Sequence, residues 1–178
     1  MVEVRNELTD QPPIIRYTGV FDFDKLYKSI TKWYKAHGYD MQEKKYVHKG
    51  KELEFEWFGD KKITEYYKYE IEVALFIWEF GETEVVKDGQ TIKMNKGRIQ
   101  MVIKGAYVLD YAKSWGSTPA PVKSISDIPN KKFVHYMQDL YHKYIINKDI
   151  IFKVYSPLYK LVYGFYDDVR ETIGMEHM

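Results

Sequence analysis

The most regular hydrophobic pattern in the chain is an alternation between Thr64 and Phe80. Its odd positions are all apolar: Tyr67, Tyr69, Ile71, Val73, Leu75 and Ile77. A period of two puts such residues on one side of a strand, so this segment is predicted to be a β-strand lying on the core. Its even positions change from polar to aromatic, in the order Lys68, Glu70, Glu72, Ala74, Phe76, Trp78, Phe80. We therefore expect the aromatic end of the second face to be covered by another part of the chain, another copy, a ligand or a lipid surface.

The N-terminal part predicts one helix between strands. Leu26, Ile30 and Trp33 fall at helical spacing, and Asp22 or Asp24 can cap the first turn. The expected elements are a flexible lead at 1–13, a strand at 14–21, a helix at 23–37 ending at Gly38, a hairpin of 39–47 and 52–58 around Lys49-Gly50-Lys51, and a turn at Gly59-Asp60. Short turns join these strands, so antiparallel pairing is expected.

Beyond the long strand, the pattern predicts shorter strands and then a helical tail. The expected elements are strands at 83–86, 91–94 and 98–111, with a tight turn at Asp88-Gly89 and a break in the ladder at Lys96-Gly97, a linker loop at 114–129, and helices at 130–147 and 149–173. Pro157 interrupts the last helical pattern, so we expect a kink there or a fresh start with Ser156 as the cap.

These elements together predict a single α+β domain over residues 1–178. Its centre is a twisted antiparallel sheet of five to seven strands, backed on one face by the N-terminal helix and the C-terminal helical tail. A length of 178 residues suits one domain. Residues 14–113 carry the sheet and the first helix, and the tail at 130–178 is too short to build its own core.

Charge and cysteine content exclude several classes of function. Lys+Arg 27 against Asp+Glu 26 gives a net charge of +1, whereas a dedicated polyanion binder carries a large positive excess. The absence of cysteine excludes disulfides and thiolate chemistry and fits a reducing compartment. No segment resembles a secretory signal or a membrane span, so a cytoplasmic location is expected. The 17 Tyr, 9 Phe and 4 Trp indicate large contact surfaces instead.

No catalytic or metal-binding motif stands out. Asp139 and His142 form an Asp-x-x-His pair, but facing helices offer no matching carboxylates, so solvated helix residues are the favoured interpretation. Several carboxylates could share one sheet face, where cross-strand ion pairs would explain them without catalysis: Glu52, Glu54, Glu56, Glu70 and Glu72. Phosphate loops, nucleophile elbows and zinc-protease motifs are absent. The sequence therefore predicts a protein that is not an enzyme and that holds no cofactor and no metal.

Lysines at the predicted hairpin tips lie near tyrosines and could bind single-stranded nucleic acid by stacking and phosphate contact. The basic members of this cluster are Lys44, Lys45, His48, Lys49, Lys51, Lys61 and Lys62. Lysines are common in loops, and the balanced total charge weakens salt-driven binding. A nucleic-acid partner is therefore not expected.

The last helix carries aromatic residues on a second face, beside its main apolar stripe. The members of this second line are Phe152, Tyr159, Tyr163 and Tyr166. A helix that is apolar on two faces is usually buried on both. The favoured interpretation is packing under the preceding helix, and the alternatives are self-association and shallow seating on a bilayer surface assisted by Lys153 and Lys160.

Four segments resemble a group of small archaeal proteins without an assigned activity: FDFDKLYKSITKWYKAHGYD, LEFEWFGDKKITEYYKYEIEV, GRIQMVIKGAYVLDY and YHKYIINKDI. This resemblance spans about Phe21 to Tyr166 and implies an archaeal source and a single-domain layout. In element order alone, the chain is similar to helix-grip folds, in which a sheet curls around a long C-terminal helix and encloses an apolar pocket. Two tail helices and a polar sheet face depart from that order.

The sequence thus predicts a non-enzymatic binding or self-assembly protein that uses an aromatic surface. The predicted contact residues are Phe76, Trp78 and Phe80 of the long strand and Phe152, Tyr159, Tyr163 and Tyr166 of the last helix. The expected partner is a second copy, as in a homo-oligomer, or another protein. The alternative is a helix-grip-like carrier, in which the same aromatics enclose an apolar ligand or lipid.

Overall fold

The computed structural model describes residues 4–64, 67–87, 90–109 and 150–175. The strands are β1 (Val4–Glu7), β2 (Ile14–Phe21), β3 (Asp40–Lys49), β4 (Glu52–Lys62), β5 (Tyr67–Lys87) and β6 (Gln90–Leu109). The helices are α1 (Phe23–Ala36) and α4 (Ser156–Ile173), the latter preceded by a π-helical segment, Ile150–Tyr155. The predicted linker at 114–129 and the predicted helix at 130–147 lie outside the described residues.

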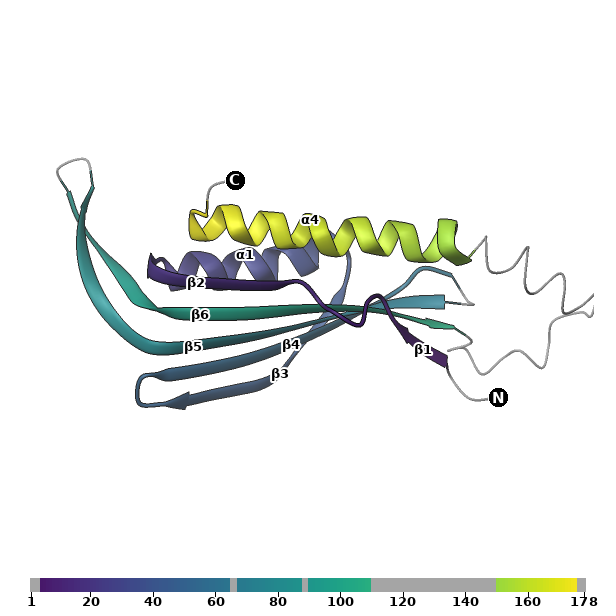
Figure 1. Cartoon of the computed structure of the whole chain (residues 1–178), viewed down its shortest axis with the longest axis horizontal. Helices are drawn as coiled ribbons and strands as arrows, with labels where there is room; N and C mark the ends of the chain where they lie inside the picture. The colour runs from purple at the N-terminus through teal and green to yellow at the C-terminus, as the bar shows by residue number, and fades with distance from the viewer. Residues whose placement is uncertain (1–3, 65–66, 88–89, 110–149, 176–178) are drawn as a thin grey trace, which may run out of the picture.

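The described chain forms two layers, a six-stranded antiparallel sheet and a pair of helices on one of its faces (Figure 1). The strand order is β1-β6-β5-β4-β3, and β2 also pairs with β6. β1 and β2 therefore lie one after the other along the same edge of β6, while β3 forms the opposite edge. The prediction of an α+β fold with an N-terminal and a C-terminal helix is confirmed.

Local signals explain where the helices begin and end. Asp22 caps α1, because its side chain accepts a hydrogen bond from the Lys25 amide, and Gly38 follows the helix with a φ of 69°. α4 begins with Pro157 in its first turn, as predicted, and ends at Gly174 in the left-handed conformation. The expected cap by Ser156 was wrong, because the π-helical segment continues into α4 and Tyr155 occupies the cap position without a side-chain hydrogen bond.

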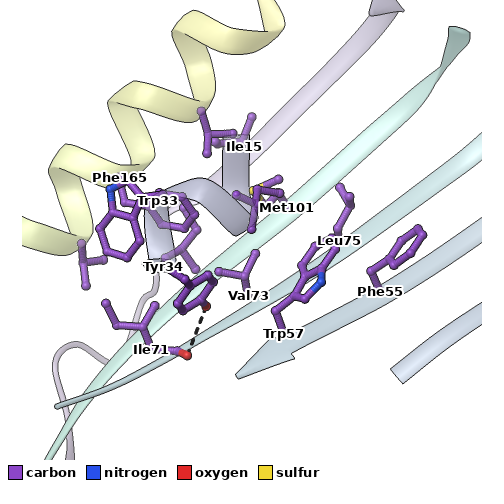
Figure 2. Close-up of a cluster of buried hydrophobic side chains, with 14 of the residues drawn as sticks. Ile15, Trp33, Tyr34, Phe55, Trp57, Ile71, Val73, Leu75, Met101 and Phe165 are labelled. Atoms are coloured by element: carbon purple, nitrogen blue, oxygen red, sulfur yellow. Dashed lines mark hydrogen bonds between the residues drawn. The ribbon is translucent and has the colours of Figure 1, made fainter. Parts of the chain in front are cut away.

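Aromatic and aliphatic side chains fill the space between the helices and the sheet (Figure 2). Trp57 and Tyr34 are fully buried, and Trp33 packs on Phe165 with ring centroids 4.2 Å apart. The Tyr34 hydroxyl donates a hydrogen bond to the Ile71 carbonyl at 3.2 Å, as Figure 2 shows. The sheet and both helices therefore share one core.

Three predicted boundaries were wrong. Residues 4–7 of the predicted flexible lead form β1, which pairs with residues 106–109 of β6. Gly59-Asp60 is not a turn, since β4 continues to Lys62 and Gly59 lies under the Tyr34 ring. Gly97 does not end the pairing: a register shift in β5 lies opposite it, but β5 and β6 pair again beyond it and continue as one long hairpin that turns toward the helix layer (Figure 1).

A β-bulge interrupts the register of β5 and reverses its faces. Trp78 pairs with Arg98 and Gly81 pairs with Lys96, so Glu79 and Phe80 together oppose Gly97. Glu79 takes a φ of 58°, the conformation that an inserted bulge residue needs. The Phe80 amide donates to the Lys51 carbonyl at 2.9 Å. Side chains after the bulge therefore point to the opposite face from the one that simple alternation predicts.

Candidate protein-binding surfaces

No helix of the described chain covers the sheet face opposite α1 and α4 (Figure 1). We call this face the outer face. Phe76 and Trp78 lie on it half-buried, with stacked rings 6.0 Å apart at an interplanar angle of 14°. The Arg98 guanidinium lies 5.4 Å from the centre of the Trp78 ring. The two rings are thus shielded partly by each other and partly by a cation from β6.

A shallow groove runs beside these two rings. Its volume is about 220 Å³, and Val47, Glu54, Phe76 and Trp78 are among the residues that line it. Val47 and Glu54 reach the outer face because they pair in register across β3 and β4, and Glu54 pairs with Phe76. The groove is therefore a feature of the sheet surface and not an opening into the core.

The structure separates Phe80 from Phe76 and Trp78, with which the sequence had grouped it. The bulge turns Phe80 to the helix side, where its ring packs edge-to-face on Phe23 at 5.8 Å. Strict alternation gave the wrong face for Phe80, because one inserted residue changes the parity of the strand. Phe80 acts in the core at the base of the long hairpin.

The other end of the outer face carries paired charges. Glu70 is almost fully buried and contacts Arg5 at 3.2 Å and Lys68 at 3.0 Å. Further along the sheet, Lys45 donates to Glu54 at 2.6 Å, and this hydrogen bond raises the pKa of the Lys45 ammonium. These carboxylates neutralise neighbouring cations, as expected of cross-strand ion pairs on a solvated face.

The second aromatic line of the last helix forms a continuous stack along one side of α4. Tyr155 lies 6.1 Å from Tyr159, Tyr159 lies 4.3 Å from Tyr163, and Tyr163 lies 6.4 Å from Tyr166, measured between ring centroids. Phe152 is 72% exposed and Tyr159 is 39% exposed. We call Phe152, Tyr155, Tyr159, Tyr163 and Tyr166 the tyrosine flank.

Contacts within the tyrosine flank change its chemistry. The hydrogen bond between Tyr159 and Tyr163, together with partial burial, raises the pKa of the Tyr163 phenol. The Arg170 guanidinium lies 5.5 Å from the centre of the Tyr166 ring. Its Nε atom is buried and has no hydrogen-bond partner among the described residues. The C-terminal end of the flank therefore holds a buried donor that is still unpaired.

The tyrosine flank points away from α1. Phe165 and Thr172 are the α4 residues that meet α1, through Trp33 and Ser29 respectively. The α4 members of the flank, Tyr159, Tyr163 and Tyr166, lie roughly 100° to 160° around the helix from Phe165, at 3.6 residues per turn. Because α4 packs over β6 and β2 while α1 packs toward β3, the flank borders the sheet edge formed by β1 and β2.

The predicted contact residues thus fall into two surfaces and one core position. Phe76 and Trp78 belong to the outer face, the α4 residues belong to the tyrosine flank on the helix side, and Phe80 belongs to the core. The sequence missed Tyr155, although its four-residue spacing to Tyr159 was visible. It also missed that β2 lies at an edge of the described sheet, because neighbours in a sheet are not set by the chain order alone.

The described residues show neither a metal site nor a membrane-spanning helix. They contain no group of three His, Cys, Asp or Glu side chains placed to hold an ion. Within the same residues, no helix combines the length and the apolar character needed to cross a bilayer. Asp139 and His142 lie outside the described residues.

Comparisons of the chain with protein-family models, curated proteins and solved structures found no match.

Proposed function

We propose that this protein is a non-enzymatic assembly protein that binds through the outer face and the tyrosine flank. The observation that carries the proposal is the tyrosine flank, a stack of rings along a helix side that the described chain leaves partly exposed. Tyrosine supplies a large apolar area with a polar tip and is enriched in protein interfaces. Burying this flank against a partner would remove apolar surface from water and give its hydroxyls new partners.

The outer face supports the same proposal. Trp78 and Phe76 are aromatic anchors beside a groove, with Arg98 and Glu54 at the border. Binding hot spots are commonly tryptophan, tyrosine and arginine surrounded by a polar rim. The two surfaces lie on opposite layers of the fold, so one copy could contact two partners at the same time.

A carrier of an apolar ligand is less well supported by the geometry. A helix-grip carrier holds its ligand between the helix and the sheet. In the described residues this space is occupied by the side chains of Trp33, Tyr34, Trp57 and Phe165. We therefore place the binding surfaces on the outside of the molecule. The cytoplasmic location and the archaeal source remain predictions from the sequence.

Trp78→Glu tests the role of the outer face. We expect the variant to fold, because the side chain is only half-buried, and to form a smaller native particle than the wild type in light scattering. Loss of a tryptophan anchor costs roughly 2 kcal/mol or more, so the association constant should fall about 30-fold or more.

Tyr46→Glu is the matched control. Tyr46 is an aromatic residue of the β3 edge that is 56% exposed and belongs to neither surface. Its substitution should leave the particle mass unchanged. A wild type that stays monomeric at high concentration, and that retains no protein partner on purification, would contradict the proposal.

A further inference from the structure

The two edges of the sheet differ in how they are protected against pairing. β3 carries a register shift between Glu43 and Lys45, and lysines are spread along it. Bulges and edge lysines both discourage a second strand from adding. β2 runs for eight residues without a bulge, with Arg16 as its one charged residue. The described sheet therefore has one edge, β3, that resists pairing with another strand and one edge, β2, that does not.

The direction of the backbone groups of β2 follows from two hydrogen bonds. The Ile103 amide donates to the Pro13 carbonyl, so residue 13 faces β6. Backbone groups alternate in direction along a strand, so the odd residues of β2 face β6 and the even residues face outward. The Tyr17 hydroxyl donates to the Val20 carbonyl at 3.0 Å, which agrees with an outward Val20. In the described sheet β2 pairs with β6 alone, so the outward amides and carbonyls of Ile14, Arg16 and Thr18 take part in no ladder between described strands.

We propose that β2 pairs antiparallel with β2 of a second copy about a two-fold axis at Tyr17. This register is the one that gives all four outward residues a partner, with Ile14 opposite Val20 and Arg16 opposite Thr18 of the second copy. It forms about six backbone hydrogen bonds without disturbing the bond between Tyr17 and Val20. It also covers Ile14, which is 39% exposed, with an apolar residue, and it places no like charges opposite each other.

The position of α4 also favours a second copy as the partner of β2. Figure 1 shows the C-terminal half of α4 running beside β2, which α4 contacts, and Tyr166 and Arg170 belong to this half of the helix. A two-fold axis through the edge brings the same two residues of the second copy toward them.

The size of the contact reaches the lower limit for a specific interface. The strand is about 26 Å long at 3.3 Å per residue, and the sheet and helix layers together are about 20 Å thick. The strip therefore covers on the order of 500 Å² on each copy, or about 1,000 Å² in total, at the lower limit for a specific interface. An isologous contact closes on itself, so it yields a dimer and not a fibre.

The inference rests on the proposed function, since Tyr166 belongs to the tyrosine flank, and it names the partner as a second copy. The β2 pairing and the outer-face contact can be tested separately in the Trp78→Glu variant, in which the outer face is expected to lose its binding. We expect that variant to be a dimer of about twice 21.3 kDa. If Trp78→Glu reduces the particle directly to a monomer, the outer-face proposal stands and the β2 pairing is wrong.

Thr18→Pro, made in the Trp78→Glu variant, tests the edge itself. Proline removes the outward amide of residue 18 and is tolerated on edge strands, because the bonds to β6 come from the odd residues. We expect a folded monomer, with the dissociation constant raised about a hundredfold or more. Thr18→Val keeps the amide and should remain dimeric. A Thr18→Pro protein that remains dimeric would overturn the inference.

A cysteine cross-link tests the register in a variant that needs no proline. The chain has no cysteine, so a disulfide can come only from an introduced residue. Tyr17→Cys places two thiols at the two-fold axis, where opposing Cα atoms are about 4.5 Å apart, within disulfide reach. We expect a covalent dimer under mild oxidation for Tyr17→Cys and none for Tyr46→Cys on the β3 edge. Equal cross-linking at both positions, or none at residue 17, would show that this register is wrong.

Discussion

Two buried tyrosines, Tyr34 and Tyr39, use their hydroxyl groups differently. The Tyr34 hydroxyl donates to the Ile71 carbonyl, whereas the Tyr39 hydroxyl is buried with no partner among the described residues. A buried hydrogen bond contributes about 1 kcal/mol, and an unpaired buried polar group costs about as much or more. The two hydroxyls therefore affect the stability of the fold in opposite directions.

The paired substitutions Tyr34→Phe and Tyr39→Phe test this difference. We expect Tyr34→Phe to lower the free energy of unfolding by about 1 to 2 kcal/mol, because the Ile71 carbonyl is left without its donor. Tyr39→Phe should be neutral or stabilising by up to about 1 kcal/mol. Urea denaturation measures both. An equal loss of unfolding free energy in the two variants would contradict the expected difference between the two hydroxyls.

At the scale of single elements, the sequence predicted element type better than element boundaries. Period-two and helical spacing located α1 and β2 almost to the residue and found the β3–β4 hairpin, although β4 runs four residues further than predicted. Two of the errors fell on glycines. Gly59 was interpreted as a turn residue and Gly97 as a break in the ladder, but a Cβ at Gly59 would lie 2.6 Å from the Tyr34 ring, and one at Gly97 would lie 3.0 Å from the Trp78 carbonyl. Some glycines are needed because another part of the fold lies too close to leave room for a Cβ. The neighbouring residues in the sequence do not distinguish such a glycine from a glycine in a turn.

Substitutions at two glycines test the helix propensity of α4 and its packing against β6. A Cβ at Gly105 would lie 2.8 Å from Cγ2 of Val162, so Gly105→Ala should push α4 from the sheet and cost about 1 to 3 kcal/mol. Gly164 lies on the exposed side of α4 with no atom near its Cβ position. Gly164→Ala should therefore stabilise the protein by roughly 0.5 to 1 kcal/mol through helix propensity. Thermal unfolding of both variants checks the two signs.

For the whole molecule, the arrangement of layers decided which candidate residues could act together. The sequence predicted the aromatic residues of the outer face and of the tyrosine flank. It could not show that they lie on opposite layers, nor that β6 is long enough to hold both β1 and β2 on one edge. Those facts depend on pairings between residues far apart in the chain, which local periodicity does not encode.

Alkaline pH should destabilise the whole fold through its buried phenols. Burial raises the pKa of Tyr69 to about 12 and raises the pKa values of Tyr34 and Tyr39 as well. An unfolded tyrosine ionises near pH 10, so the unfolded state loses protons first as the pH rises. Stability from these groups is therefore complete below about pH 10 and is lost as the pH rises toward 12.

Urea midpoints measured across this range test the expectation. The midpoint should fall as the pH is raised above about 10, and it should fall less steeply in Tyr69→Phe, which removes one of the phenols. Tyrosinate absorbance should show late ionisation of the buried groups. A urea midpoint that does not change with pH up to about 11.5 would contradict the expectation.

The single residue inserted at Glu79 has a consequence for how the long hairpin could diverge among related chains. Deleting that residue would place Phe80 directly after Trp78 and opposite Gly97, so the side chains beyond it would keep their sides while the cause of the local bend was removed. Phe80 would stay on the side of Phe23. A one-codon change in length could thus straighten the hairpin and carry its tip away from the helix layer, while every pair in the ladder stays the same.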